Sequence, residues 1–290
     1  MLNETYIHLP SIGTVGEQKI WQHTPTTWTH LVDRPDVLRA GPATCLNSNI
    51  KDLSRRRYGR IASGLARRHH WRALCYRRKE EILSTRWLAL DIETTGLRPG
   101  LNETTVVGIC GHATDFEPVP ILADRDGVWW DQLNEYLSRS DIIISYNGTC
   151  FDIPFLLEES GGYLQFPSLH LDLRFFLASL GYKGGLKKVQ QQMGYFRDSG
   201  LRDLDGYMAV ILWQEHLKKR RGALDTLIRY CLEDVVVLLP MARQGYLLAS
   251  KALDRGWSCP DVPDISLDDF HFDDNIISEL LDRRHPTHSQ

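Results

Sequence analysis

Five short apolar runs with the length and composition of β-strands constrain the fold of this chain more than any other feature. They read RWLALDI, TTVVGIC, PVPIL, DIIISYN and LHLDLRF, at residues 86–92, 104–110, 118–122, 141–147 and 169–175. Only turns separate the first three runs, whereas helix-like segments stand between the third, fourth and fifth. This order predicts an α/β domain over residues 84–250, in which helices flank a mixed β-sheet.

The helices expected around this sheet follow from the spacing of apolar residues and from glycines at their ends. They cover residues 128–138, 150–160, 173–180, 184–194 and 203–248, and the last of these segments divides into two helices near Gly222.

A small, mainly helical module is expected over residues 1–45. Its stretch YIHLPSIGTVGEQKIW begins as an apolar, strand-like segment, turns around Gly13 and Gly16, and continues into a helix that carries Ile20 and Trp21. Similar turns occur in helix-hairpin-helix modules, whose backbone amides face DNA phosphates, although Ser11 stands where the first glycine of that pattern would be. A phosphate-binding hairpin and a simple packing turn both fit.

Charge is distributed unevenly along a chain whose net charge is only −3. Residues 46–83 form a basic, helix-compatible segment, in which positions 51–80 hold eleven Lys or Arg against two acids. Aromatic residues lie between these arginines, which favours a nucleic-acid surface over an ordinary solvated face, since rings can stack on unpaired bases. Residues 251–290 form an acidic tail that we expect to be loosely ordered.

The composition is that of a soluble globular protein. No apolar run reaches membrane-spanning length, and the first residues lack the pattern of a secretory signal, so we expect a cytoplasmic protein with no membrane partner. The six cysteines include no C-x-x-C pair, which indicates reduced thiols without a zinc knuckle or a disulfide framework.

The first strand ends in two acids with one residue between them. In LALDIETTGL, residues 88–97, strand alternation places Asp91 and Glu93 on the same face. Two like charges in a mostly buried position require a metal ion, a basic side chain or a shared proton between them. A solvated strand end is the alternative, so the pair needs partners from elsewhere in the chain.

Two later segments supply further acids. Asp152 follows the fourth strand at the start of a helix, where it could also serve as a helix cap. In LIRYCLEDVVVLL, Tyr230 and Asp234 lie one helical turn apart, and Asp234 is at the margin of an apolar stripe. A carboxylate at the edge of a buried stripe is costly unless a cation or a hydrogen-bond donor compensates its charge.

Together, DIETTG, YNGTCFDIPFL and YCLEDV resemble the three exonuclease motifs of the DEDD superfamily of 3′→5′ exonucleases, which has a ribonuclease H-like fold. The third motif has the tyrosine form, because Arg229 stands where the histidine form has its histidine. The order of GGLKKVQQQMG, LRDLDGYMAVILW and YCLEDVVVL is also similar to YprB-like predicted exonucleases, over about residues 84–250.

The resemblance implies a role for each matching position. Asp91, Glu93, Asp152 and Asp234 would be the ligands of two Mg²⁺ or Mn²⁺ ions, and Tyr230 would orient the attacking water. Oxygen ligands suit these hard cations. Asn147 and Phe151 match the second motif and would hold the terminal nucleotide or brace the site.

Further candidate substrate contacts are Thr94, directly after the acidic pair, and Lys187 and Lys188, at a glycine-rich turn that opens a helix. A solvated helix start explains the two lysines equally well. Other polar residues are also open to two interpretations. Asp172 is more consistent with a structural cap than with a fifth acid, and Arg197 and Arg202 would contact nucleic acid or pair with Asp203 and Asp205.

The sequence therefore predicts a metal-dependent 3′→5′ exonuclease that acts on DNA, with single-stranded 3′ ends as the expected substrate. The alternatives are a ribonuclease acting on RNA, a structure-specific endonuclease with the same carboxylates, and a non-catalytic nucleic-acid-binding subunit that uses its N-terminal region.

Overall fold

The computed structural model describes residues 6–23, 27–54, 85–123, 127–167, 169–252, 259 and 261–284. Its centre is a five-stranded sheet in the order β3-β2-β1-β4-β5. The strands are β1 (Trp87–Thr94), β2 (Thr104–Gly111), β3 (Val119–Leu122), β4 (Ile142–Ser145) and β5 (Leu169–Asp172). β2 pairs antiparallel with β1 and β3, whereas β4 is parallel to β1 and β5, so the predicted mixed sheet is confirmed.

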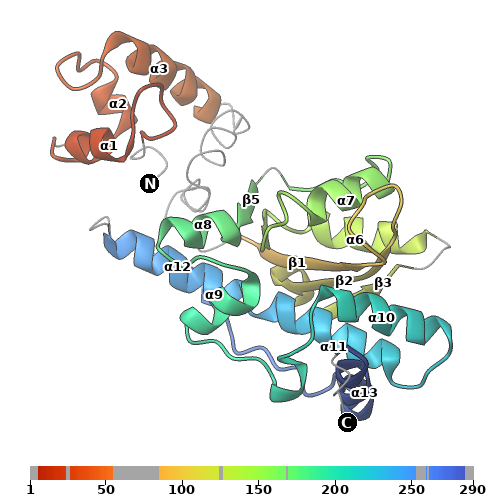
Figure 1. Cartoon of the computed structure of the whole chain (residues 1–290). Helices are drawn as coiled ribbons and strands as arrows, with labels where there is room; N and C mark the ends of the chain where they lie inside the picture. Colours follow the sequence, from red (N-terminus) through yellow and green to blue (C-terminus); the bar gives the residue numbers. More distant parts are fainter. Residues whose placement is uncertain are drawn as a thin grey trace.

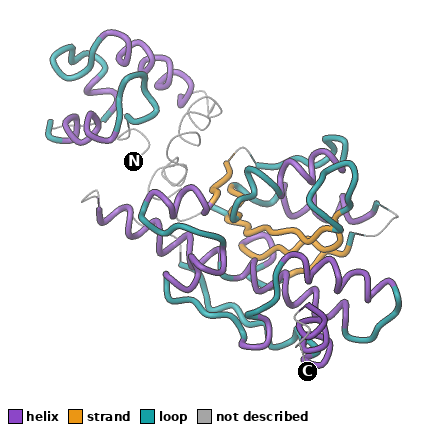
Figure 2. The backbone as a smooth tube through the Cα atoms, in the orientation of Figure 1, coloured by secondary structure: helices purple, strands orange, loops and turns teal. Residues whose placement is uncertain are grey.

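Helices cover both faces of this sheet (Figure 1). On one face, α6 (Val128–Ser138) and α7 (Asp152–Glu159) pack their apolar side chains against Leu88, Leu90 and Ile92 of β1. The opposite face receives α8 (Leu173–Ser179), α10 (Gly206–Leu217), α11 (Ala223–Val236) and α12 (Leu238–Ala252). Figure 2 shows the strands between these helical layers.

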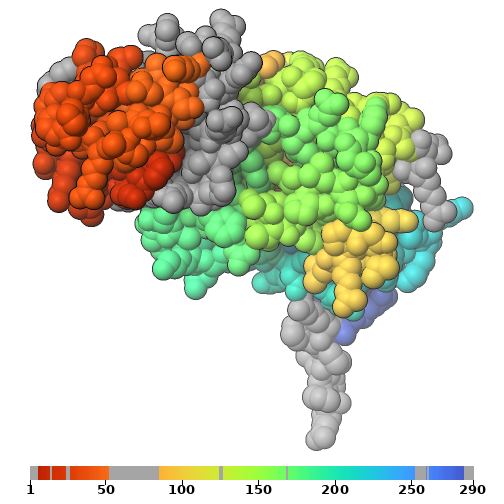
Figure 3. Space-filling model, turned by 90° about the horizontal axis from the view of Figure 1, so that it is seen from above, coloured from red at the N-terminus to blue at the C-terminus, as the bar shows by residue number. Residues whose placement is uncertain are grey.

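Three elements complete this domain: the short 3-10 helices η3 (His112–Thr114) and η4 (Ser199–Leu201), and α9 (Leu186–Gln192). The five strands and the helices expected before residue 203 are confirmed. The expectation of two helices over 203–248 is wrong in one respect, since a second break at Val237 separates α11 from α12. The turn after β1 is on the surface, with Leu97 81% and Leu101 76% exposed (Figure 3).

The N-terminal region contains α1 (Thr14–Trp21), α2 (Trp28–Leu31) and α3 (Ala40–Ser54). Tyr6, Trp28 and Leu31 are fully buried, which gives these short helices an apolar centre. Residues 6–12 form turns, so the expected strand-like start is not found, and no helix precedes the turn at Gly13 in the described part. Helix α3 crosses the module boundary expected at residue 45, and residues 55–83 of the basic segment lie outside the described residues.

The acidic C-terminal region is more ordered than the sequence suggested. Its helix α13 (Asp274–Arg284) buries Ile276, Ile277 and Leu280 in the cluster formed by α10 and α11. Arg229 on α11 also fixes the segment before α13, because its guanidinium donates to the backbone carbonyls of Leu267 and Phe270. The expectation of a loosely ordered tail is therefore wrong for residues 261–284.

Among the described helices, none has both the length and the apolar character needed to cross a lipid bilayer.

Candidate metal centre

The two acids of β1 lie on the sheet face that α11 covers. Asp91 pairs with Gly108 of β2, and Glu93 follows two residues later with 7% of its surface exposed. Burial raises the pKa of the Asp91 carboxyl to about 7, and a neighbouring Arg197 limits this rise. Burial also raises the pKa of Glu93, and the negative charges of Asp91 and Asp152 add to the effect. The negative charges of this pair must therefore be offset by a cation or by a bound proton.

Asp152 reaches this pair through a tight turn between β4 and α7. Asn147 has a left-handed backbone with φ of 71°, and Gly148 lies so close to Ser145 that a Cβ at this position would be 2.2 Å from the Ser145 Oγ atom. The turn places Asp152 at the first residue of α7, with 3% exposure. Its Oδ1 atom accepts a hydrogen bond of 3.1 Å from the backbone N–H of Ile92, which stands between the two β1 acids.

Helix α11 brings Tyr230 and Asp234 against the same strands. The approach depends on Gly108, because a Cβ there would lie 2.7 Å from the Val235 side chain and 2.9 Å from the Cys231 sulfur. Tyr230 is 4% and Asp234 is 9% exposed. Burial raises the pKa of the Tyr230 phenol above its ordinary value, and the charge of Glu93 raises it further.

The donor set is suited to a hard divalent cation. One ligand atom each of Asp91, Glu93 and Cys231 lies within 4.8 Å of the others. Burial raises the pKa of the Cys231 thiol, so this sulfur stays protonated and is a poor ligand for Mg²⁺ or Mn²⁺. The carboxylates of Asp91, Glu93 and the adjoining Asp152 are the groups that could hold such an ion.

Arg197 is the residue of this centre that sequence reasoning did not place. Its guanidinium forms an ion pair with Asp234, and its Nε atom donates to the Gln190 side-chain oxygen over 3.0 Å. The guanidinium carbon is 6.0 Å from the centroid of the Tyr230 ring. Arg197 comes from the loop between α9 and η4, which has no periodic pattern, so no sequence signal marked it as a partner of Asp234.

The two candidate lysines differ in position. The Lys187 ammonium lies 5.2 Å from the centroid of the Tyr230 ring and donates to the backbone carbonyl of Arg202 over 3.4 Å. Burial, with the nearby positive Arg197 as a second cause, lowers the pKa of Lys187 to about 8. Lys188 is exposed and its aliphatic stem lies beside Gly184. Lys187 is thus brought to the acidic centre, and Lys188 faces solvent.

The remaining candidate contacts are placed around the centre by local hydrogen bonds. Thr94 donates to the Gly96 carbonyl over 2.6 Å, which shapes the turn after β1. The Asn147 side-chain oxygen accepts a hydrogen bond from Arg174, and both line a second hollow near α8. Phe151 precedes α7, and its ring centroid is 5.5 Å from that of Phe155.

Asp172 has the structural role that the sequence favoured. Its carboxylate is fully buried and accepts hydrogen bonds from the backbone N–H groups of Asn147, Thr149 and Arg174. It therefore caps α8 and fixes the turn that delivers Asp152.

Comparison with protein families identifies the superfamily of this domain. A family model described as the RNase H superfamily matches residues 88–245. Among solved structures, a family B DNA polymerase from the hyperthermophilic archaeon Pyrobaculum calidifontis aligns with a TM-score of 0.44 and 18% identity. This alignment covers 58% of the chain and 27% of the polymerase, so the chain spans about a quarter of that protein.

The Aedes aegypti Nibbler EXO domain aligns with a TM-score of 0.39 and 14% identity, over 70% of this chain and 89% of that domain. No curated protein matches the chain.

Proposed function

The chain belongs to the RNase H superfamily, and from this premise we propose that it is a metal-dependent nuclease that removes nucleotides from the 3′ end of a DNA strand. One observation carries the proposal. Acids from two distant segments converge, because Asp152 bonds to the backbone between Asp91 and Glu93. Asp234 on α11 pairs with Arg197, whose charge also acts on Asp91 and Glu93.

In this proposal Asp91, Glu93, Asp152 and Asp234 hold two Mg²⁺ or Mn²⁺ ions. When bound, divalent ions stabilise the negative charge that develops on the attacking and leaving oxygens of a phosphodiester. The raised pKa values of Asp91, Glu93 and Asp152 support this role, since buried acids near one another favour a bound cation over their separate ionisation.

Tyr230 has a hydrogen-bonding role in this scheme. Because burial and Glu93 raise the pKa of its phenol, Tyr230 stays protonated at neutral pH and cannot act as a general base. Its hydroxyl instead orients the attacking water. The tyrosine one helical turn before Asp234 is also the feature that favours exonucleolytic cleavage, through the resemblance of YCLEDV to the third exonuclease motif.

A 5′-labelled single-stranded DNA oligonucleotide, incubated with Mn²⁺, tests the direction of cleavage. We expect a ladder that shortens from the 3′ end, no cleavage of a circular single strand, and no products from Asp91→Asn. Discrete internal fragments, or cleavage of the circle, would instead identify an endonuclease. The rates of degradation of the same sequence as single-stranded RNA and as blunt duplex DNA are then compared with that of the single-stranded DNA. We expect unpaired DNA to be degraded fastest.

A further inference from the structure

Arg197 is a buried cation placed among acids that we assign to metal ions. Its side chain is 5% exposed and the side chain of its partner Asp234 is 12% exposed. The charge of Arg197 also acts on both acids of β1, since it opposes the burial-driven rise in the pKa of Asp91 and of Glu93. Arg197 therefore neutralises part of the centre's negative charge.

A divalent cation and this guanidinium would compete for Asp234. Both carry positive charge, and in a low-dielectric site two like charges at contact distance repel strongly. The Asp234 Oδ1 atom is the one paired with Arg197. A metal ion bound at this oxygen would displace Arg197 from its present partner.

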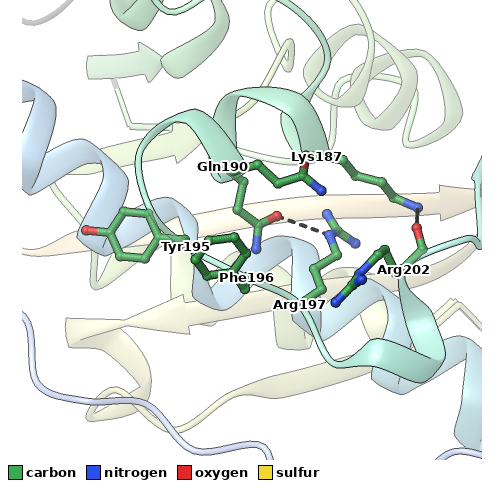
Figure 4. A pocket seen from close by; sticks show the side chains of 7 residues that line it. Lys187, Gln190, Tyr195, Phe196, Arg197 and Arg202 are labelled. Carbon is green, nitrogen blue, oxygen red and sulfur yellow. Dashed lines mark hydrogen bonds between the residues drawn. The ribbon is translucent and has the colours of Figure 1, made fainter.

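Arg197 also lines a pocket that could receive its side chain. A pocket of about 180 Å³ is lined by Arg197, Lys187, Arg202, Gln190, Gln191 and Phe196, together with Tyr195 (Figure 4). None of these described lining residues is an acid, and Phe196 is 76% exposed. Cations beside amide groups and an exposed aromatic ring are the chemistry that holds a phosphate and an unpaired base.

We propose that Arg197 is an exchangeable counter-ion, which neutralises Asp234 while metal is absent and binds a phosphate of the substrate strand in the neighbouring pocket once a divalent cation has taken its place. This inference rests on the proposed function, because it assigns the metal to Asp234. It couples two binding events: Arg197 would leave Asp234 when a divalent cation is held there, and the released side chain would then strengthen binding of the strand. The side chain that offsets part of the negative charge of the metal-free site thereby becomes a substrate contact.

Direct binding of Mn²⁺ without nucleic acid tests the first part of this proposal, that Arg197 competes with the metal ion at Asp234. The measured quantity is the free Mn²⁺ signal in electron paramagnetic resonance, for the unmodified protein, Arg197→Gln, Arg197→Lys and Arg202→Gln. Since the competing charge is removed, we expect Arg197→Gln to bind Mn²⁺ roughly tenfold more tightly. Arg197→Lys keeps the positive charge, so its affinity for Mn²⁺ should stay close to that of the unmodified protein. Arg202→Gln, the matched control from the same pocket, leaves Mn²⁺ affinity unchanged.

Fluorescence anisotropy with a labelled oligo(dT) strand tests the second part of the proposal, that the released Arg197 binds the substrate strand. Saturating Ca²⁺ replaces Mn²⁺ to slow hydrolysis, and a gel checks that the strand stays intact. In EDTA we expect Arg197→Gln and the unmodified protein to bind the strand equally, because Arg197 is then held by Asp234. With Ca²⁺, Arg197→Gln binds roughly tenfold more weakly than the unmodified protein, the typical effect of one lost charge-assisted contact. Arg202→Gln weakens strand binding in both conditions.

The outcomes separate this inference from the proposed function. If the unmodified protein binds Mn²⁺ but Arg197→Gln binds it no more tightly, the counter-ion role is wrong and the metal site stands. Equal weakening of strand binding by Arg197→Gln in EDTA and in Ca²⁺ also overturns the exchange. If the unmodified protein binds no Mn²⁺, the proposed function fails together with the inference. Circular dichroism of each variant shows that the fold is kept.

Discussion

The Oδ1 atom of Asp152 accepts the backbone N–H of Ile92 over 3.1 Å, so the acid of one motif is attached to the strand that carries the other two. This contact makes Asp152 both a charge of the metal centre and a part of the sheet's attachment to α7. The two roles are separable by substitution, because asparagine keeps an oxygen acceptor and loses the negative charge.

Asp152→Asn is therefore expected to remain folded and to lose hydrolysis by at least about 100-fold, since it removes a charge that the metal ions require. Asp152→Ala also leaves the Ile92 N–H without its acceptor, and we expect a free energy of unfolding lower by about 1–3 kcal/mol. Urea denaturation and a gel-based nuclease assay measure the two effects. Equal stability of the two variants would show that the hydrogen bond adds nothing to folding.

Removal of the Tyr230 hydroxyl tests whether this residue orients water. Tyr230→Phe keeps the ring that Lys187 approaches to 5.2 Å, so substrate affinity and stability should change little. We expect kcat to fall by roughly 100-fold, at the lower end of what a positioned hydrogen-bonding group contributes. Because the raised pKa keeps the phenol protonated, the pH–rate profiles of both proteins should have the same shape below pH 9. A rise in rate with pH that occurs only when Tyr230 is present would identify it as a titrating base.

The strands and most helices of the domain were predictable because each has an apolar pattern of the correct period. The exceptions have local causes. Helix α13 was missed because the acids at 268–274 dominate the composition, although Ile276, Ile277 and Leu280 form an apolar face one turn long. The break at Val237 has a sequence signal three residues later, since Pro240 has no N–H to donate to the carbonyl of Val236, where α11 ends.

The candidate site was predictable to the extent that motifs mark it. Asp91, Glu93, Asp152, Tyr230 and Asp234 lie in recognisable segments, and the structure brings these segments together. The pairing of Arg197 with Asp234 was not predictable, since it joins a loop to a helix 37 residues later and depends on tertiary packing. The sequence offered nucleic acid, or Asp203 and Asp205, as partners of Arg197 and Arg202, and nothing in it indicated Asp234.

The pH dependence of stability follows from the buried acids. The pKa of Asp91 is raised to about 7, and those of Glu93 and Asp152 are raised as well. Between about pH 4 and pH 7 the folded, metal-free protein therefore binds more protons at these groups than the unfolded chain does, and their contribution makes stability fall as pH rises. The stabilisation that these protonated acids give to the folded protein is fully present at acidic pH. It is lost as the pH rises through the pKa values that the acids have in the folded state.

We therefore expect Tm in EDTA to fall by several degrees from pH 5.5 to pH 8, and Mn²⁺ to raise Tm more at pH 8 than at pH 5.5, because the ion binds the ionised acids. Differential scanning fluorimetry measures both. Asp91→Asn, which cannot ionise, should give a flatter profile in EDTA. An unchanged profile in that variant would assign the pH dependence to other groups.

The approach of α11 to the sheet depends on the absence of a side chain at position 108. In Gly108→Ala the new methyl group would meet the Val235 and Cys231 side chains at 2.7 and 2.9 Å, so the helix must shift away from β2. We expect the free energy of unfolding to fall by about 1–3 kcal/mol, the usual effect of overpacking a core. Because Tyr230 and Asp234 are on the same helix, Mn²⁺ affinity and hydrolysis should fall too.

Gly41→Ala is the matched control, because a Cβ at that position meets nothing within 4 Å. This variant should retain the stability, the Mn²⁺ affinity and the hydrolysis of the unmodified protein. Full Mn²⁺ affinity in Gly108→Ala would show that the metal centre tolerates displacement of α11.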